Sequence, residues 1–349
     1  MRREALLYDR LQGGAVRCRV CQWECRIPEG KLGVCRTRLN EGGTLYTLIY
    51  GETSSVAVDP IEKKPLFHFH PGSRVFSLGT WGCNFHCKHC QNWQISYARP
   101  GDGGWVVRGA YRGRGEQMTP AETVAAARRY GCAGIAWTYN EPAIWLEHTL
   151  ESARLAREAG LYTVYVTNGY ASQAALDAIG PYLDAYRVDV KGFGDRLYRE
   201  LARVARPEGI LRMAERARHR WGMHVEVVTN VIPTMNDDPG QLAAIAEWIR
   251  DALGPETPWH VTRFFPHAEM RHLPPTPVAT IMAAREIGLR SGLRFVYVGN
   301  LAGGDAENSY CPSCGRLAVR RAGFRAEPVG VAPGGRCRHC GADLNIRGV

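Results

Sequence analysis

The sequence contains no apolar run that approaches the ~20 residues needed to span a bilayer. Its basic N-terminus, residues 1–10, is not followed by the apolar core of a secretory signal. These two absences argue against a secreted or membrane-spanning protein. They predict a cytoplasmic protein with no membrane partner.

Lysine is scarce in this chain and supplies only five of the 44 basic residues. The formal net charge of +10 therefore comes mainly from arginine, and a skewed genome base composition is the explanation we favour. A basic surface attracts an acidic electron carrier, an acidic protein or RNA. Because the sequence lacks the aromatic-interleaved basic stretches and fold motifs of RNA-binding proteins, nucleic acid is not the expected partner.

Cysteine, in contrast, is abundant, with twelve residues that fall into three groups and leave only Cys132 alone. Short C-x2-C and C-x3-C loops suit metal ligation and give poor disulfide geometry, and a chain without a secretory signal belongs in a reducing compartment. The groups are the N-terminal group (Cys18, Cys21, Cys25 and Cys35), the central triad (Cys83, Cys87 and Cys90) and the C-terminal group (Cys311, Cys314, Cys337 and Cys340).

The chain divides into three regions: an N-terminal four-cysteine module with lead-in strands over residues 1–72, a large domain over 73–302, and a C-terminal module over 303–349. The large domain alternates helical patterns with short apolar runs, which are typical of buried parallel strands. The expected strands are residues 75–78, 134–138, 162–167, 185–190, 224–229, 260–265 and 295–298.

This alternation predicts an α/β fold with a parallel sheet. Six or seven units favour a partial (β/α)6-type barrel over a full eight-unit barrel, and a doubly wound sheet is the alternative. In both architectures the functional residues follow the carboxyl ends of the strands. The glycine-rich stretch over residues 101–116 predicts a flexible loop that serves as a lid.

The central triad directly follows the first strand of the large domain. Three thiolates on one tight loop hold three corners of an iron–sulfur cubane and leave the fourth iron open, since no fourth cysteine lies nearby. A structural metal site would be closed by a fourth ligand. The alternative is a zinc knuckle with His86 or His89 as the fourth ligand.

The C-x3-C-x2-C spacing, with Phe85 before Cys87 and His89 before Cys90, resembles the signature of the radical S-adenosylmethionine (SAM) superfamily. The resemblance implies a [4Fe–4S] cluster on the central triad, with SAM chelating its open iron. One electron from the reduced cluster would then cleave the sulfonium, and the 5′-deoxyadenosyl radical would abstract hydrogen from a protein or small-molecule substrate. The protein's part in such chemistry is to position the reacting atoms and exclude competitors.

Motifs at the other strand ends fit this resemblance. Residues 139–142 read Tyr-Asn-Glu-Pro and resemble a variant of the family's motif for the SAM amino group. Residues 167–169 and 189–192 resemble SAM-contacting motifs of glycyl-radical-enzyme activases, and an arginine on the sixth strand is suited to a carboxylate. The cofactor-binding residues so predicted are Phe85, His89, Asn140, Glu141, Thr167, Asn168, Asp189, Lys191 and Arg263.

The resemblance is closer to one group within the superfamily. Residues 61–72, Gln91-Asn92, the Tyr-Asn-Glu-Pro motif and both flanking cysteine groups resemble the AmmeMemoRadiSam system radical SAM enzyme, which is related to the pyruvate formate-lyase activating enzyme. The implied partners are a flavodoxin- or ferredoxin-type electron donor and proteins of the two families with which this group is genomically associated.

The flanking cysteine groups predict further metal sites. The C-terminal group has the spacing of a zinc ribbon and predicts structural Zn²⁺, which stabilises a segment too small for a core of its own. For the N-terminal group, Zn²⁺ is favoured and an auxiliary iron–sulfur cluster that relays electrons is the alternative, since soft thiolates serve both.

Two other functions compete with the leading hypothesis. One is a radical SAM enzyme that modifies RNA, because the C-terminal arginines suit phosphates. The other is a zinc scaffold that docks partners without catalysis, although it would leave an open three-cysteine site without purpose. The substrate cannot be inferred from the sequence, because loops and pocket shape determine it.

Overall fold

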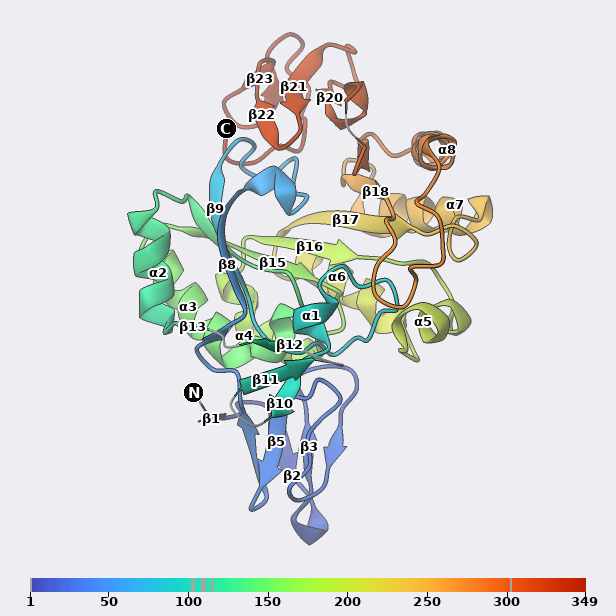
Figure 1. Cartoon of the computed structure of the whole chain (residues 1–349). Coiled ribbons are helices and arrows are strands. Elements are labelled where there is room, and N and C mark those ends of the chain that lie inside the picture. The colour runs from blue at the N-terminus through green and yellow to red at the C-terminus, as the bar shows by residue number, and fades with distance from the viewer. Residues whose placement is uncertain (1, 102–103, 108–110, 114–115, 302) are drawn as a thin grey trace.

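A computed structural model describes residues 2–101, 104–107, 111–113, 116–301 and 303–349. Its centre is an eight-stranded sheet in the order β19-β18-β17-β16-β15-β14-β9-β8 (Figure 1). All neighbours are parallel except β8 and β9. The strands are β8 (Ser55–Pro60), β9 (Arg74–Gly79), β14 (Gly134–Trp137), β15 (Tyr162–Thr167), β16 (Ala185–Asp189), β17 (His224–Val231), β18 (Trp259–Arg263) and β19 (Val296–Gly299).

The seven strands predicted from apolar runs are the seven parallel strands of this sheet, with ends that differ by at most two residues. Their order in the sheet follows the chain without the reversal of a doubly wound sheet. The structure therefore confirms an α/β fold with a mostly parallel sheet. All carboxyl ends of the parallel strands meet at one edge, where the predicted site residues follow them.

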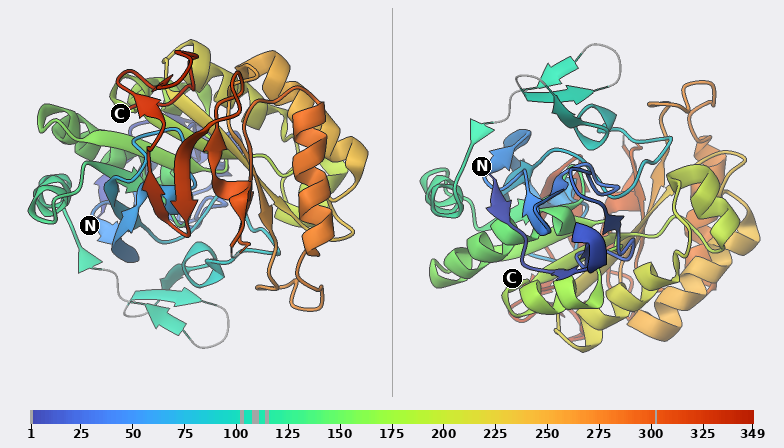
Figure 2. Two further views of the ribbon diagram at one scale, coloured as in Figure 1. Left: turned by 90° about the horizontal axis from the view of Figure 1, so that it is seen from above. Right: turned by 90° about the horizontal axis from the view of Figure 1, so that it is seen from below.

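Helices pack along the outside of the curved sheet (Figure 2). The predicted capping box is present at Thr119, whose side chain accepts from the Glu122 amide while Glu122 accepts from the Thr119 amide. No helix in the described residues is both long and apolar enough to cross a membrane. The helices are α1 (Trp93–Ser96), α2 (Pro120–Arg129), α3 (Leu146–Glu158), α4 (Gln173–Ile179), α5 (Asp195–Ala202), α6 (Glu208–His219), α7 (Pro239–Trp248) and α8 (Val278–Arg290), with short turns η1 (Gln12–Gly14), η2 (Ile61–Lys63), η3 (Pro142–Trp145), η4 (Gly180–Tyr182), η5 (Ile249–Leu253) and η6 (Asp305–Glu307).

The two faces of the sheet differ in polarity. On β17, Val225 and Val227 belong to the main apolar core, whereas Glu226 points the other way and accepts hydrogen bonds from the backbone of residues 67 and 68 and from His260. Successive side chains of a strand face opposite sides, so one face packs against helices while the inner face carries polar groups. This polar inner face leads to the candidate site.

The N-terminal module lies at one end of the sheet (Figure 1). An isolated β-bridge joins Cys21 of this module to Ala171, which follows the carboxyl end of β15. The module therefore contacts the edge at which the parallel strands end. Its strands form the sheets β1-β6-β5 and β2-β3-β4, and its strand β7 pairs with β13, which comes later in the chain. They are β1 (Arg3–Glu4), β2 (Tyr8–Arg10), β3 (Val16–Cys18), β4 (Arg26–Ile27), β5 (Arg38–Glu41), β6 (Thr44–Thr47), β7 (Glu52–Thr53) and β13 (Glu116–Gln117).

The C-terminal module lies at the opposite end of the sheet (Figure 1). The buried ring of His68 bonds the carbonyl of Leu344 at 2.8 Å and the hydroxyl of Tyr297 at 2.5 Å. The buried Arg321 donates to the carbonyl of Phe67 at 2.6 Å. These contacts fasten the module to the central sheet. Its strands are β20 (Ser309–Tyr310), β21 (Leu317–Ala322), β22 (Arg325–Glu327), β23 (Val331–Ala332) and β24 (Arg336–Cys337).

The predicted loop over residues 101–116 contains regular structure, so that prediction was wrong for its described part. A small antiparallel sheet is formed by β10 (Arg99–Gly101), β11 (Gly104–Val107) and β12 (Tyr111–Gly113). The buried Trp105 stacks on Trp81 with ring centroids 6.0 Å apart, which gives this glycine-rich stretch an apolar anchor. Residues 102–103, 108–110 and 114–115 of the predicted lid lie outside the described residues.

Candidate active site

A cavity of about 700 Å³ opens at the carboxyl ends of the parallel strands. Every residue predicted for the central site lines it, although these residues come from segments as far apart as 83 and 263. Their individual roles remain predictions. They are Cys83, Cys87, Cys90, Phe85, His89, Asn140, Glu141, Thr167, Asn168, Asp189, Lys191 and Arg263.

The cysteine loop leaves β9 through Gly82, which has a φ of +78°. A Cβ at this position would lie 2.6 Å from the carbonyl oxygen of Cys35, so only glycine fits here. Beyond it, the buried Cys83 and the half-buried Cys87 and Cys90 face the cavity. The hydroxyl of Tyr97 donates to the carbonyl of Cys87 at 2.6 Å and fixes the middle of the loop.

Asn140 holds the start of the cysteine loop. Its Nδ2 donates to the carbonyls of Thr80 and Gly82 at 2.9 and 2.6 Å, and its Oδ1 accepts from the Thr80 amide at 3.2 Å. A primary amide has two N–H donors, and both are engaged here. The side chain predicted to bind the cofactor therefore directs its donors at the backbone of the loop that carries the triad.

Glu141 is buried beside the triad and is bonded to the end of β15. Its carboxylate accepts from Thr167 Oγ1 at 2.8 and 3.0 Å, from the Asn168 amide at 2.8 Å and from the Ala143 amide at 2.9 Å. Burial raises its pKa to about 7, against the lowering effect of these donors. Since a carboxylate offers about four acceptor positions and three donors are present, room remains for one further N–H donor.

The side chain of Asn168 links β15 to the cysteine loop. Its Nδ2 donates to Asn84 Oδ1 at 2.8 Å and lies 4.0 Å from the sulfur of Cys83, while its Oδ1 accepts from the Tyr170 amide at 3.0 Å. N–H groups directed at thiolate ligands tune the potential of an iron–sulfur cluster. Asn168 is thus placed to influence the sulfur as well as to hold the loop.

Charged residues line the wall formed by β16. Asp189 Oδ1 pairs with Arg187 at 2.5 Å, and its Oδ2 lies 3.8 Å from the Lys191 ammonium. Burial opposes ionisation of Asp189, but the two cations outweigh it and hold its pKa below the ordinary value. Burial likewise disfavours the charge of Lys191, yet Asp189 and Cys87 raise its pKa. The pair therefore favours the charged form of both groups.

His89 and Arg263 occupy different parts of the cavity wall. Burial lowers the pKa of His89 to about 3, so its ring is neutral. Arg263 donates from Nε to the carbonyl of Thr276 at 2.9 Å and lies over the ring of Phe265. These contacts hold the guanidinium at the cavity wall.

The sequence reasoning missed several cavity residues. Arg187 shares a strand face with Asp189, and that alternation was the available signal. Tyr139 has a φ of +70°, donates from its hydroxyl to Asp59 at 2.7 Å, and accepts from Asn92 at its carbonyl at 2.7 Å. A left-handed non-glycine residue beside a site is typical of stored strain. No local pattern indicated this conformation.

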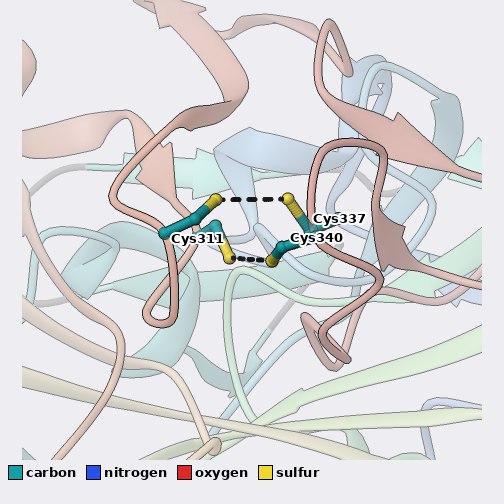
Figure 3. A group of neighbouring side chains, drawn as sticks. Cys311, Cys337 and Cys340 are labelled. Atoms are coloured by element: carbon teal, nitrogen blue, oxygen red, sulfur yellow. Dashed lines mark hydrogen bonds between the residues drawn. The ribbon is translucent and has the colours of Figure 1, made fainter.

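The C-terminal group brings its sulfur atoms close together (Figure 3). Its four sulfur atoms all lie within 4.8 Å of one another, with Cys311–Cys340 at 3.6 Å and Cys314–Cys337 at 3.7 Å. A tetrahedral ion with metal–sulfur bonds of about 2.3 Å requires sulfurs about 3.8 Å apart. The predicted four-cysteine cluster is therefore present, with the spacing that a single tetrahedral ion requires.

The central triad has a different geometry. Within the described residues, neither the triad nor the triad with its neighbouring histidines forms a group as tight as the C-terminal one. This spacing disfavours the zinc knuckle and fits the larger cubane, whose four irons and four sulfides separate the ligands. The three thiols at the cavity wall would therefore hold a [4Fe–4S] cluster and leave one of its irons without a cysteine ligand.

Comparison with known proteins agrees with this geometry. A family model described as "Radical SAM superfamily" matches residues 79–248. An uncharacterized protein of Methanocaldococcus jannaschii is 41% identical over 345 residues, which cover 99% of each chain. The isethionate sulfite-lyase activating enzyme of Nitratidesulfovibrio vulgaris is 26% identical over 165 residues, which cover 47% of this chain and 53% of that enzyme.

Among solved structures, a radical SAM methyltransferase from Sphaerobacter thermophilus is 18% identical, with a TM-score of 0.49 and 71% of each chain covered. The sequence matches, together with an open cysteine triad at the carboxyl edge of a parallel sheet, identify the family. Residues 79–248 form a domain of the radical SAM superfamily, a class of enzymes that use an iron–sulfur cluster and SAM.

Proposed function

We propose that this protein is a radical SAM enzyme that cleaves SAM reductively and uses the 5′-deoxyadenosyl radical to abstract hydrogen from a protein or small-molecule substrate. The single observation that carries the proposal is the central triad, whose three thiols line a cavity of about 700 Å³. A cluster held there by three cysteines keeps one iron for a ligand, whereas a structural site would have a fourth cysteine.

The cluster, when bound to the triad, supplies the electron that breaks the sulfonium bond. The chain's own residues position the reactants. Glu141, with one acceptor position left, suits the amino group of SAM, and the cation of Lys191, which lines the same cavity, suits its carboxylate. Asn140 and Asn168 hold the loop in place through five hydrogen bonds or sulfur contacts to it.

The finer features of the fold support the same proposal. The sequential order of the parallel strands, with helices along the outside, suits the partial (β/α)6-type barrel of radical SAM cores. We assign Zn²⁺ to the C-terminal group, because its sulfur spacing is that of a single tetrahedral ion. Similarity to an activating enzyme favours an activase-like reaction, with an electron donor of the flavodoxin or ferredoxin type.

The test is SAM cleavage by the full chain, purified anaerobically, reconstituted with iron and sulfide, and reduced with dithionite. We expect release of 5′-deoxyadenosine by the wild type and none above background by Cys83→Ala. Cys132→Ala is the matched control, because this cysteine is buried away from the cavity and should leave cleavage unchanged. Absence of cleavage by a wild type that carries its full complement of iron would refute the proposal.

A further inference from the structure

The sulfur atoms of the N-terminal group are spaced too widely for one tetrahedral ion. In the part of the chain that the structure describes, only the C-terminal group brings three or more metal-binding side chains within 4.8 Å of one another. The four N-terminal cysteines are nevertheless neighbours, since all of them line one small cavity. A shared cavity with widely set thiols fits a cubane, which places four irons and four sulfides between its ligands.

A buried cation lines the same cavity. The guanidinium of Arg38 is 1% exposed and is held by Glu147 at 2.8 and 3.0 Å and by the carbonyl of Ile144 at 3.1 Å. Its Nε has no hydrogen-bond partner among the described residues. A buried N–H without a partner is costly, whereas a sulfide or thiolate of an anionic cluster would accept from it. Arg38 therefore indicates an anionic occupant of this cavity. The wide spacing of the thiols favours an iron–sulfur cubane as that occupant.

The N-terminal group also abuts the loop of the central triad. The carbonyl of Cys35 packs on Gly82, which directly precedes Cys83. On the other side of Cys83, Trp23 donates from its indole nitrogen to the carbonyl of Asn84 at 2.8 Å. The backbone of Cys35 and the side chain of Trp23, two residues after Cys21, thus contact the two chain neighbours of a central ligand, and only a short path of bonds and van der Waals contacts separates the two sites.

From these observations we propose that the N-terminal group holds a second [4Fe–4S] cluster, which passes electrons to the cluster on the central triad. The favoured sequence-based assignment of this group was zinc, and the thiol spacing is the reason to replace it. The existence of the second cluster is independent of the proposed function, whereas its role as a relay depends on it.

The relay step is a one-electron transfer. A reduced low-potential carrier protein gives one electron to the N-terminal cluster, which is reduced and then reoxidised as it gives that electron to the central cluster. One electron enters for each sulfonium bond that is cleaved, and no proton or covalent bond changes at the N-terminal group. The half-buried Cys25, beside the exposed Arg26 and Val34, gives a carrier access to this side of the cluster.

The first experiment leaves the N-terminal group intact and removes the central triad with Cys83→Ser, Cys87→Ser and Cys90→Ser together. We expect the reconstituted variant to keep about four iron atoms and about one zinc per chain. Its reduced protein should give a cluster signal in electron paramagnetic resonance that SAM does not alter. About two zinc atoms and no iron would overturn the second cluster, whatever the wild type does with SAM.

The relay is tested with the same variant and with Cys21→Ser/Cys35→Ser. A reduced flavodoxin or ferredoxin should reduce the remaining cluster of the triad variant; failure to do so would overturn the relay. The Cys21→Ser/Cys35→Ser variant should keep cleavage driven by dithionite and lose cleavage driven by the carrier protein. This comparison is made on variant protein that retains the central cluster. If SAM cleavage falls equally with dithionite and with the carrier protein, or falls with neither, the relay is contradicted.

Discussion

Asn140 gives the sharpest test of how the chain positions its cysteine loop. Replacing it by alanine removes three hydrogen bonds to the backbone of Thr80 and Gly82. At a net value of about 1 kcal/mol each, the loop should lose about 3 kcal/mol of local stability. That loss corresponds to roughly a hundredfold increase in local opening, since about 1.4 kcal/mol changes an equilibrium tenfold.

The assay is hydrogen exchange, measured by mass spectrometry on peptides that span residues 80–97. Asn140→Ala should exchange faster there, and its iron content after reconstitution should fall. Asn140→Asp keeps the shape but turns a carboxylate oxygen toward the carbonyls of Thr80 and Gly82, so we expect an effect at least as large. Both variants act on the loop before any SAM is added.

The matched control is Asn230→Ala. Asn230 lines the same cavity, but its side chain bonds Thr262 and not the cysteine loop. Exchange over residues 80–97 should therefore match the wild type. If Asn140→Ala also exchanges like the wild type in this peptide, the argument that Asn140 holds the loop is wrong.

Three further predictions concern stability and metal content. Glu147→Ala leaves Arg38 buried without its carboxylate and should lower the free energy of unfolding by about 3–5 kcal/mol in urea titrations. Glu200→Ala removes one member of the exposed Arg196–Glu200 pair and should lower the free energy of unfolding by less than about 0.5 kcal/mol. Equal losses of stability in the two variants would contradict the argument that burial makes the carboxylate partner of Arg38 necessary. Because burial raises the pKa of Glu141 to about 7, the unfolded chain releases a proton that the folded chain keeps, and stability should fall as pH rises from about 5 to 7. Glu141→Gln should lose this contribution in SAM-free protein, and an unchanged pH slope would contradict the assignment. A chelator should release about one zinc and make residues 303–349 sensitive to protease while the central sheet stays resistant. If protease cuts residues 303–349 equally fast in metal-loaded and in chelator-treated protein, no metal stabilises this module.

Local patterns in the sequence were sufficient for the strands and for the central triad. The seven parallel strands were predictable because strands buried on both faces require short apolar runs, and each run is visible without knowledge of its neighbours. The triad was predictable because its three cysteines lie within eight residues, and a loop that short brings them to one cavity. The strand-end rule then placed Glu141, Asp189 and Lys191 in the cavity.

The same local patterns misled in one place and were incomplete in another. The glycine-rich stretch after Gly101 predicted a loop, but burial of Trp105 against Trp81 organises three short strands there. For Asn140, the resemblance of its motif to a variant of the family's motif for the SAM amino group predicted a cofactor-binding role, which stays a prediction. What the sequence did not indicate is that its donors meet the carbonyls of a loop some 60 residues earlier in the chain, a contact that no short motif encodes.

Taken alone, the sequence indicated the three cysteine groups as candidate metal ligands, the position of the parallel strands, and the superfamily signature. Tertiary structure alone decided how the three cysteine groups differ and where they lie. It set one group at tetrahedral spacing and two at wider spacing, and it placed the N-terminal group against Gly82. The physical reason is that ligand spacing along a chain limits which atoms can meet, whereas the distances at which they meet are set by packing between segments remote in sequence.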